Sequence, residues 1–171
     1  ITDIEVAREL LKRVISYGHE SVIEHANFTF MIEGVSRAMT HQLVRHRIAS
    51  FTQQSQRYVD LSGKEDYFVV PESMRTNELK GVMEKFCAEC AQLYTELVKS
   101  GIPAEDARFV LPNATQTKIV VTMNARELRH FFNLRCCYRA QWEIREVAWE
   151  MLRQCKEVAP SLFRNAGPSC V

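Results

Sequence analysis

Basic, hydroxyl and amide side chains are concentrated in one short segment, Arg45–Arg57, which reads RHRIASFTQQSQR. The planar, permanently charged guanidinium of arginine suits phosphate groups and the polar edges of planar heterocycles. Serine hydroxyls and the backbone N–H groups of a turn can complete such an anion-binding concavity. A single arginine near a helix end usually only keeps a surface solvated. Three arginines, two histidines and two serines between residues 41 and 57 instead favour a binding site.

The composition of the whole chain limits what this site can bind. Of the 171 residues, 46% are hydrophobic and 25% are charged, which is typical of an ordered globular domain. The net charge of +1 argues against a surface that binds polyanions in general. Any anion is therefore expected to bind locally. No linker-like stretch divides the chain, so we predict a single domain over residues 1–171.

The expected location is the cytoplasm, without a membrane partner. No uninterrupted apolar stretch is long enough to cross a bilayer, and the first residues lack the pattern of a secretory signal. Cys87 and Cys90 have helical spacing, and Cys136 and Cys137 are adjacent and difficult to bridge. We therefore expect reduced, mostly buried thiols, and core packing rather than a redox pair for Cys87-x-x-Cys90.

Hydrophobic periodicity and turn residues predict the elements that position this segment in the first half of the chain. They are a helix from a Thr2-x-x-Glu5 capping box to Gly18, a strand over 26–33 that ends at Gly34, a helix from about Ser36 towards His46, an irregular loop over the basic segment, and a short strand over 67–70.

The second half is predicted to be mostly helical. Its longest helix follows a cap at Asn77 and carries an apolar stripe that we interpret as core. That stripe consists of Leu79, Val82, Met83, Phe86, Cys87, Cys90, Leu93, Tyr94, Leu97 and Val98. The other expected elements are a short helix from Pro103 that carries Arg108, a buried strand over 119–123, and helices over 125–137, with Leu128, Phe131 and Phe132 inward, and 141–158. Helices around a few strands favour an α+β fold.

The basic segment matches R-H-R-x-x-S-x-x-x-x-S-x-R, the signature of flavin-dependent thymidylate synthases, the thymidylate synthase complementing protein family. Six positions are fixed in this pattern, so a chance match is improbable. The chain resembles the family in further blocks that occur in family order and cover nearly its whole length. They are His19-Glu20-Ser21-x-x-Glu24-His25, Phe28-Thr29-Phe30, Gln42, Arg108-x-Val110-Leu111-Pro112, Asn124-Ala125-Arg126, Leu134-Arg135 and Ala140-Gln141-Trp142-Glu143-Ile144.

The resemblance implies a small, mostly antiparallel sheet flanked by helices. It also implies reductive methylation of 2′-deoxyuridine 5′-monophosphate (dUMP) to dTMP. Methylenetetrahydrofolate would donate the carbon, and FAD reduced by NADPH would donate the hydride. The family forms homotetramers whose active sites are shared between subunits. Family members usually carry an additional amino-terminal segment, so this single domain is expected to lack it.

The resemblance also assigns residues to roles. It places the catalytic roles on Arg135, which would face the uracil ring, on His19, beside the flavin, and on Ser55. The dUMP-binding positions are Gln42, Arg45, Gln53, Ser55, Gln56 (through its backbone N–H), Arg57, Arg108 and Arg135, with Arg57 and Arg108 for the phosphate. The FAD-binding positions are Ser21, Arg45, His46, Arg47, Gln53, Asn124, Arg126 and His130.

Other interpretations follow from the residues alone. The arginine-rich loop also suits a nucleic-acid-binding module. A catalytically silent structural relative is a second alternative. A thymidylate synthase with a cysteine nucleophile is a mechanistic alternative, although no cysteine lies in an activated thiol motif. The spacing H-E-x-x-x-E-H of His19–His25 fits neither zinc-protease pattern, so we predict no metal. His25 is equally compatible with a structural role. We expect solvated helix charge at Arg129 but not at Arg126.

Overall fold

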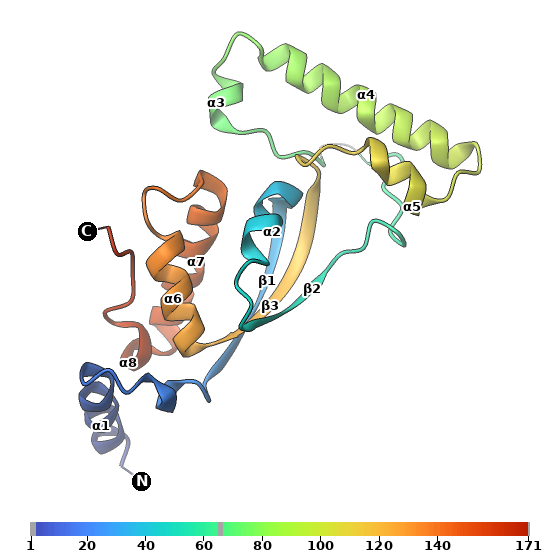
Figure 1. Ribbon diagram of the computed structural model, residues 1–171. Coiled ribbons are helices and arrows are strands. Elements are labelled where there is room, and N and C mark those ends of the chain that lie inside the picture. Colours follow the sequence, from blue (N-terminus) through green and yellow to red (C-terminus); the bar gives the residue numbers. More distant parts are fainter. Residues whose placement is uncertain (1–2, 65–66, 171) are drawn as a thin grey trace. The chain divides into compact units, whose positions relative to one another are not determined.

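The computed structural model describes residues 3–64 and 67–170 and has the predicted α+β architecture (Figure 1). Its sheet contains β1 (Asn27–Ser36), β3 (Gln116–Asn124) and β2 (Ala49–Gln53), in the order β1-β3-β2. Strands β1 and β3 are antiparallel, because Ala125 bonds to Ala26 at one end and Arg37 bonds to Thr115 at the other. The central strand β3 alternates buried and partly exposed side chains, as a sheet between a core and a polar face requires.

The chain forms two compact units, and each is described by itself. Unit 1 contains the residues up to Met31, Gln42–Phe51 and the residues from Val120 onward. Unit 2 contains Ile32–His41 and Thr52–Ile119. The three strands run through both units, so each unit holds a part of the sheet. The interpretation of residues 1–171 as one domain stays a prediction.

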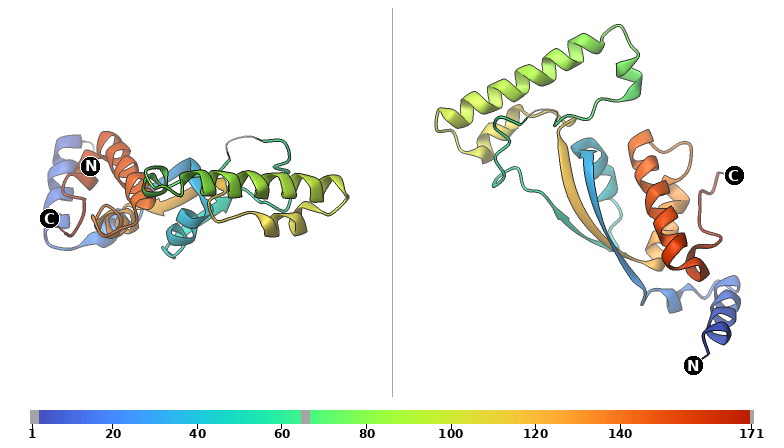
Figure 2. Two further views of the ribbon diagram at one scale, coloured as in Figure 1. Left: turned by 90° about the horizontal axis from the view of Figure 1, so that it is seen from above. Right: turned by 180° about the vertical axis from the view of Figure 1, so that it is seen from behind.

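Helices α6 (Ala125–Arg135) and α7 (Trp142–Val158) form the helical core of unit 1 and lie side by side (Figure 2). Asn124 caps α6 by accepting a hydrogen bond from the Glu127 N–H, and Gln141 caps α7 in the same way. The inward positions predicted on α6, Leu128, Phe131 and Phe132, are all buried. Helix α7 ends before Pro160, which begins the short helix α8 (Pro160–Phe163).

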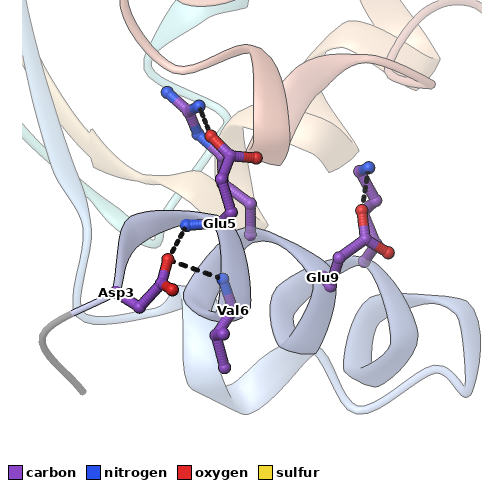
Figure 3. A network of polar contacts seen from close by, with 6 residues as sticks. Asp3, Glu5, Val6 and Glu9 are labelled. Carbon is purple, nitrogen blue, oxygen red and sulfur yellow. Dashed lines mark hydrogen bonds and ion pairs between the residues drawn. The ribbon is translucent and has the colours of Figure 1, made fainter.

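The N-cap of helix α1 (Ile4–Ser16) lies one residue after the predicted capping position. Asp3 is the N-cap, and its carboxylate accepts hydrogen bonds from the N–H groups of Glu5 and Val6 (Figure 3). Thr2 lies outside the described residues. Glu9 accepts a hydrogen bond from Lys12 on the exposed face. No described residue of α1 is buried, although its apolar side chains share one face.

Unit 2 contains one long helix and four shorter elements. The long helix is α4 (Lys80–Lys99), and the others are α3 (Glu72–Arg75), α5 (Ala104–Ala107), the 3-10 turn η2 (Arg108–Val110) and α2 (Arg37–Leu43), which ends in unit 1. Leu61, Tyr67, Tyr94 and Ala107 form the core of this unit. As predicted, Pro103 precedes a short helix, and Arg108 lies at its end.

Four sequence-based predictions of elements are wrong. The first strand does not end at Gly34 but continues to Ser36. Gly34 has φ +70°, a conformation that glycine adopts without the steric cost that other residues incur. Part of the basic segment forms β2 rather than a loop, since β3 supplies the hydrogen-bond partners. Residues 67–70 form only an isolated bridge between Phe68 and Thr115. The helix expected from Ser36 to His46 is shorter, from Arg37 to Leu43.

The apolar stripe of α4 is only partly core. Cys87, Cys90 and Tyr94 are buried, as predicted. The other side of the stripe is exposed within this chain and consists of Leu79, Val82, Phe86 and Leu93, which we call the α4 apolar face. The prediction failed because helical periodicity reports apolar character but not which surface covers it.

The described cysteines are all free, and all but Cys170 are buried, which agrees with the prediction of reduced, mostly buried thiols. Burial raises the pKa of Cys136 and of Cys155 to about 12. These two thiols are therefore protonated at neutral pH and are poor nucleophiles. Within the described residues, no helix is both long and apolar enough to cross a membrane.

Candidate functional site

Unit 1 contains a pocket of about 710 Å³ at the start of α6. Three of the predicted FAD-binding residues line it: Asn124, Arg126 and His130. Ile48, from the basic segment, lines it as well. The remaining lining residues are Glu20, Glu24, Glu127, Arg129, Asn133 and the carboxy-terminal Asn165, Ala166 and Gly167. Glu20 and Glu24 belong to a block that the sequence analysis quoted without a binding role, and the others were not predicted as site residues because they lie in separate parts of the chain.

Two carboxylates of the 3-10 turn η1 (Glu20–Ile23) and its C-cap hold the arginines of α6. Glu24 accepts a short hydrogen bond from Arg126, and Glu20 lies 3.7 Å from the Nε of the same residue. Glu20 also accepts from Nε of Arg129 at 3.3 Å. The Arg126 pKa is raised, primarily by its hydrogen bond with Glu24. These carboxylates therefore position cations at the pocket.

The expectation that Arg129 is solvated helix charge is wrong. Its side chain is only 21% exposed, and its Nη1 donates to the carbonyl of Leu162 at 2.9 Å. Arg126, in contrast, is 54% exposed at the pocket. The sequence could not separate the two arginines, because the carboxylate and the carbonyl that hold Arg129 come from distant residues.

A buried hydrogen-bonded chain joins the basic segment to both ends of α6. Nε of Arg135 donates to Nε2 of His46 at 3.0 Å, and Nδ1 of His46 lies 3.3 Å from Oε1 of Glu127. His46 and Glu127 are 6% and 7% exposed. The His46 ring packs edge-to-face on Phe131, with centroids 4.9 Å apart, and lies 6.2 Å from the ring of His130. The basic segment thus contributes a buried imidazole, rather than only surface charge.

The His46 imidazole is neutral at neutral pH. Burial, together with the charge of Arg135 and the nearby His130, lowers its pKa to about 4. Burial raises the pKa of Glu127 and lowers that of Arg135. Although His46 and Glu127 lie within ion-pair distance, their contact is therefore a hydrogen bond from a neutral imidazole.

The other predicted residues of unit 1 lie outside this chain of hydrogen bonds. His19 and Ser21 are exposed at η1, where His19 is the N-cap. Arg45 and Arg47 flank the buried His46 and are both exposed. Gln42 is partly buried near the end of α2, where its backbone carbonyl accepts a hydrogen bond from the Arg45 N–H. None of these five residues lines the pocket at the start of α6.

Unit 2 holds the amide and hydroxyl positions of the basic segment. Gln53 donates from Nε2 to the hydroxyls of Thr40 at 3.0 Å and Thr117 at 3.3 Å. The Ser55 hydroxyl accepts from the Arg57 N–H at 3.1 Å, which fixes the turn that follows β2. The Nε2 atom of Gln56 is buried and has no hydrogen-bond partner among the described residues.

Glu105, which was not predicted from the sequence, contacts two predicted arginines of unit 2, Arg57 and Arg108. Its carboxylate pairs with Arg57, and its backbone carbonyl accepts from Nε of Arg108 at 2.9 Å. Arg37, another unpredicted residue, is close enough to Arg108 for that charge to lower its pKa, after the larger effect of burial. Mutual repulsion between neighbouring guanidinium groups favours binding of an anion beside them.

Comparisons with known proteins identify the family. Residues 2–161 match the family model described as thymidylate synthase complementing protein. A flavin-dependent thymidylate synthase of Geobacter sulfurreducens is 62% identical over 162 residues, which are 94% of this chain and 70% of that protein. A protein of the same name from Pyrococcus abyssi is 57% identical, over 94% of this chain and 69% of its own length.

The chain therefore belongs to the thymidylate synthase complementing protein family, as the signature predicted. A third relative from Sulfurisphaera tokodaii, also named flavin-dependent thymidylate synthase, is 49% identical over 100% of this chain. The alternative of a nucleic-acid-binding module finds no support in these matches.

Proposed function

We propose that this chain is a flavin-dependent thymidylate synthase that methylates dUMP reductively to dTMP. The observation that carries the proposal is the pocket of unit 1, where Asn124, Arg126 and His130 meet, close to the buried His46–Arg135 pair. The family of the chain supports the same activity. FAD would supply the hydride chemistry, with NADPH as its reductant and methylenetetrahydrofolate as the carbon donor.

The pocket fits the demands of a flavin nucleotide. Its volume of about 710 Å³ lies within the range of roughly 300–1,000 Å³ that is usual for small-molecule sites. Arg126, which is paired with Glu24 and Glu20, is 54% exposed at the first turn of α6, where N–H groups and the helix dipole favour a phosphate. Asn124 and His130 add hydrogen-bonding groups on the same wall. We propose that these three residues hold FAD, with Ser21, Arg45, His46, Arg47 and Gln53 as further contacts.

Arg135 is the residue that we assign to the uracil ring. Its guanidinium carries a fixed charge beside a neutral imidazole, so His46 accepts a hydrogen bond without adding a second positive charge. Such a preorganised cation stabilises negative charge that develops on the ring. We assign the phosphate of dUMP to Arg57 and Arg108, which surround Glu105. Gln42, Arg45, Gln53, Ser55 and Gln56 complete the proposed nucleotide site, and His19 and Ser55 remain proposed catalytic residues.

We further propose a cytoplasmic homotetramer with active sites shared between subunits. The α4 apolar face supports this assembly, because such a stripe on a long helix is typical of a surface that another helix covers. The residues proposed to bind dUMP are divided between unit 1 and unit 2. In the proposed tetramer, a neighbouring subunit would contribute some of these residues to each site.

The proposal is tested with FAD and the purified protein. We expect a shift of the flavin absorption band and quenching of flavin fluorescence on binding. Under anaerobic conditions the FAD-bound protein, with NADPH, methylenetetrahydrofolate and dUMP, should produce dTMP, detected by chromatography. Omission of FAD from the apoprotein should abolish the product. A folded protein that binds FAD but produces no dTMP would refute the assigned reaction.

A further inference from the structure

The hydrogen-bonded chain Glu127–His46–Arg135 has a defined direction. Arginine Nε–H can only donate, so Nε2 of His46 must accept and must be unprotonated. The neutral imidazole then carries its proton on Nδ1, which faces Oε1 of Glu127 at 3.3 Å. The opposite tautomer would point an N–H at the Nε–H of Arg135. The arrangement is therefore compatible with a single tautomer.

Glu127 is the hydrogen-bond acceptor on the Nδ1 side of this tautomer. It is 7% exposed and lies on the opposite side of the imidazole from Arg135. Its backbone N–H is bonded to the Asn124 cap, which anchors the residue in the first turn of α6. Arg135 is the last residue of the same helix. His46 thus connects a fixed acceptor at the start of α6 to a guanidinium at its end.

We propose that Glu127 is a positioning residue for Arg135: it holds the Nδ1–H form of His46, whose Nε2 then fixes the guanidinium. This inference deepens the proposed function and rests on it, because Arg135 matters there as the residue that faces uracil. A carboxylate behind a histidine commonly sets the tautomer and the ring orientation. Here the oriented group is an arginine, so the expected consequence is nucleotide affinity rather than proton transfer.

Two variants separate this role from simple packing. Glu127→Leu removes the acceptor but retains an apolar side chain of similar size, whereas Glu127→Gln retains an acceptor oxygen without charge. In the FAD-bound protein with ring-labelled histidine, ¹⁵N NMR should show the Nδ1–H form of His46 in the parent and in Glu127→Gln. Glu127→Leu should shift the population towards the Nε2–H form. The resonance of His46 is identified by its absence in His46→Gln.

Nucleotide binding provides the second readout. Glu127→Leu should weaken dUMP binding about tenfold, the effect of losing roughly one hydrogen bond to a charged group, and Glu127→Gln should recover most of the affinity. In an Arg135→Lys background, Glu127→Leu should change dUMP binding less than twofold, because its effect passes through the guanidinium. FAD affinity is titrated in both backgrounds as well, because Glu127 also lines the pocket proposed for FAD.

Several results would overturn the inference. The first is an unchanged His46 tautomer in Glu127→Leu, and the second is an equal loss of dUMP affinity in the parent and Arg135→Lys backgrounds. The third is failure of Glu127→Gln to restore dUMP binding. The last is a loss of FAD affinity that is independent of Arg135. The last result would instead place Glu127 in direct contact with the flavin. Failure of the proposed function is distinguishable, because a parent that forms no dTMP still reports the His46 tautomer.

Discussion

The guanidinium of Arg57 and the carboxylate of Glu105 form an ion pair in unit 2, in which Nη2 and Nε lie 2.7 Å and 2.9 Å from the same Oε2. The side chains are 51% and 47% exposed, so the pair contributes little to stability. The carboxylate also lies where we propose that a nucleotide phosphate binds. Glu105 therefore orients Arg57 but opposes the charge of the phosphate.

The first prediction concerns this opposition. Glu105→Gln keeps an acceptor for Arg57 and removes the negative charge, so dUMP affinity should rise about twofold to fivefold at low salt, the scale of an exposed charge interaction. Deoxyuridine, which lacks the phosphate, should bind with unchanged affinity. The measurement is a calorimetric or fluorescence titration at two salt concentrations.

Glu89→Gln is the matched control, since Glu89 pairs with Lys85 on the exposed surface of α4 and loses the same charge. It should leave dUMP affinity unchanged. Equal dUMP affinity in Glu105→Gln and the parent would remove Arg57 and Glu105 from the phosphate site.

The sequence predicted the helical core of unit 1 well, because local signals and burial agree there. Asn124 and Pro160 mark helix boundaries, and the inward face of α6 follows helical periodicity. It failed where the deciding partner is distant. Strand β2 depends on pairing with β3, and the exposure of Phe86 depends on what covers α4.

The candidate site was predictable as a set of residue types, but not as an arrangement. The signature selected His46 and the Leu134-Arg135 block selected Arg135, yet their contact joins residues 89 positions apart and leaves no local pattern. Glu127 and Glu105 were missed for the same reason. Acidic residues are common on helices, and only the fold distinguishes one that holds a buried imidazole from one in solvent.

The second prediction is that Arg135→Lys keeps the charge but loses the function. Lysine has no counterpart of the Nε–H that His46 accepts, and its ammonium cannot donate two parallel hydrogen bonds to adjacent ring acceptors. Turnover that depends on dUMP should fall about tenfold to a hundredfold, from the loss of charge-assisted hydrogen bonds. Steady-state kinetics and separate titrations of dUMP and FAD would measure it. Unchanged dUMP affinity and turnover would exclude Arg135 from the site, whereas an equal loss of FAD would indicate misfolding.

The third prediction is a loss of stability in acid that depends on His46. The pKa of His46 is about 4 in the folded protein and 6.5 at its ordinary value. Between these values the unfolded chain binds a proton that the folded chain does not. The free energy of unfolding should therefore be unaffected by this group above pH 6.5 and fall as the pH drops towards 4, by about 2 kcal/mol at pH 4.5.

Urea unfolding of the FAD-bound protein at pH 7.5 and pH 4.5 would measure this term. His46→Gln should show a smaller difference between the two pH values than the parent. His25→Gln is the control, since His25 is exposed, and it should retain the difference found in the parent. An identical pH dependence in the parent and His46→Gln would show that His46 does not govern the acid sensitivity.

The last prediction concerns the α4 apolar face and the proposed homotetramer. Phe86 is 50% exposed near the middle of this face, and Leu79, Val82 and Leu93 continue it at helical spacing. If a second subunit covers the face, Phe86→Glu places a charge in an apolar interface at a cost of several kcal/mol. Sedimentation should then show smaller species at concentrations where the parent is a tetramer, and the specific activity should fall as the tetramer is lost.

Lys85→Gln is the control, because it changes the net charge by the same amount at a neighbouring residue of α4 that is 78% exposed. This variant should remain tetrameric. A Phe86→Glu variant that stays tetrameric would place the subunit contact elsewhere on the chain, and a fully active monomer of the parent would refute the shared-site assembly altogether.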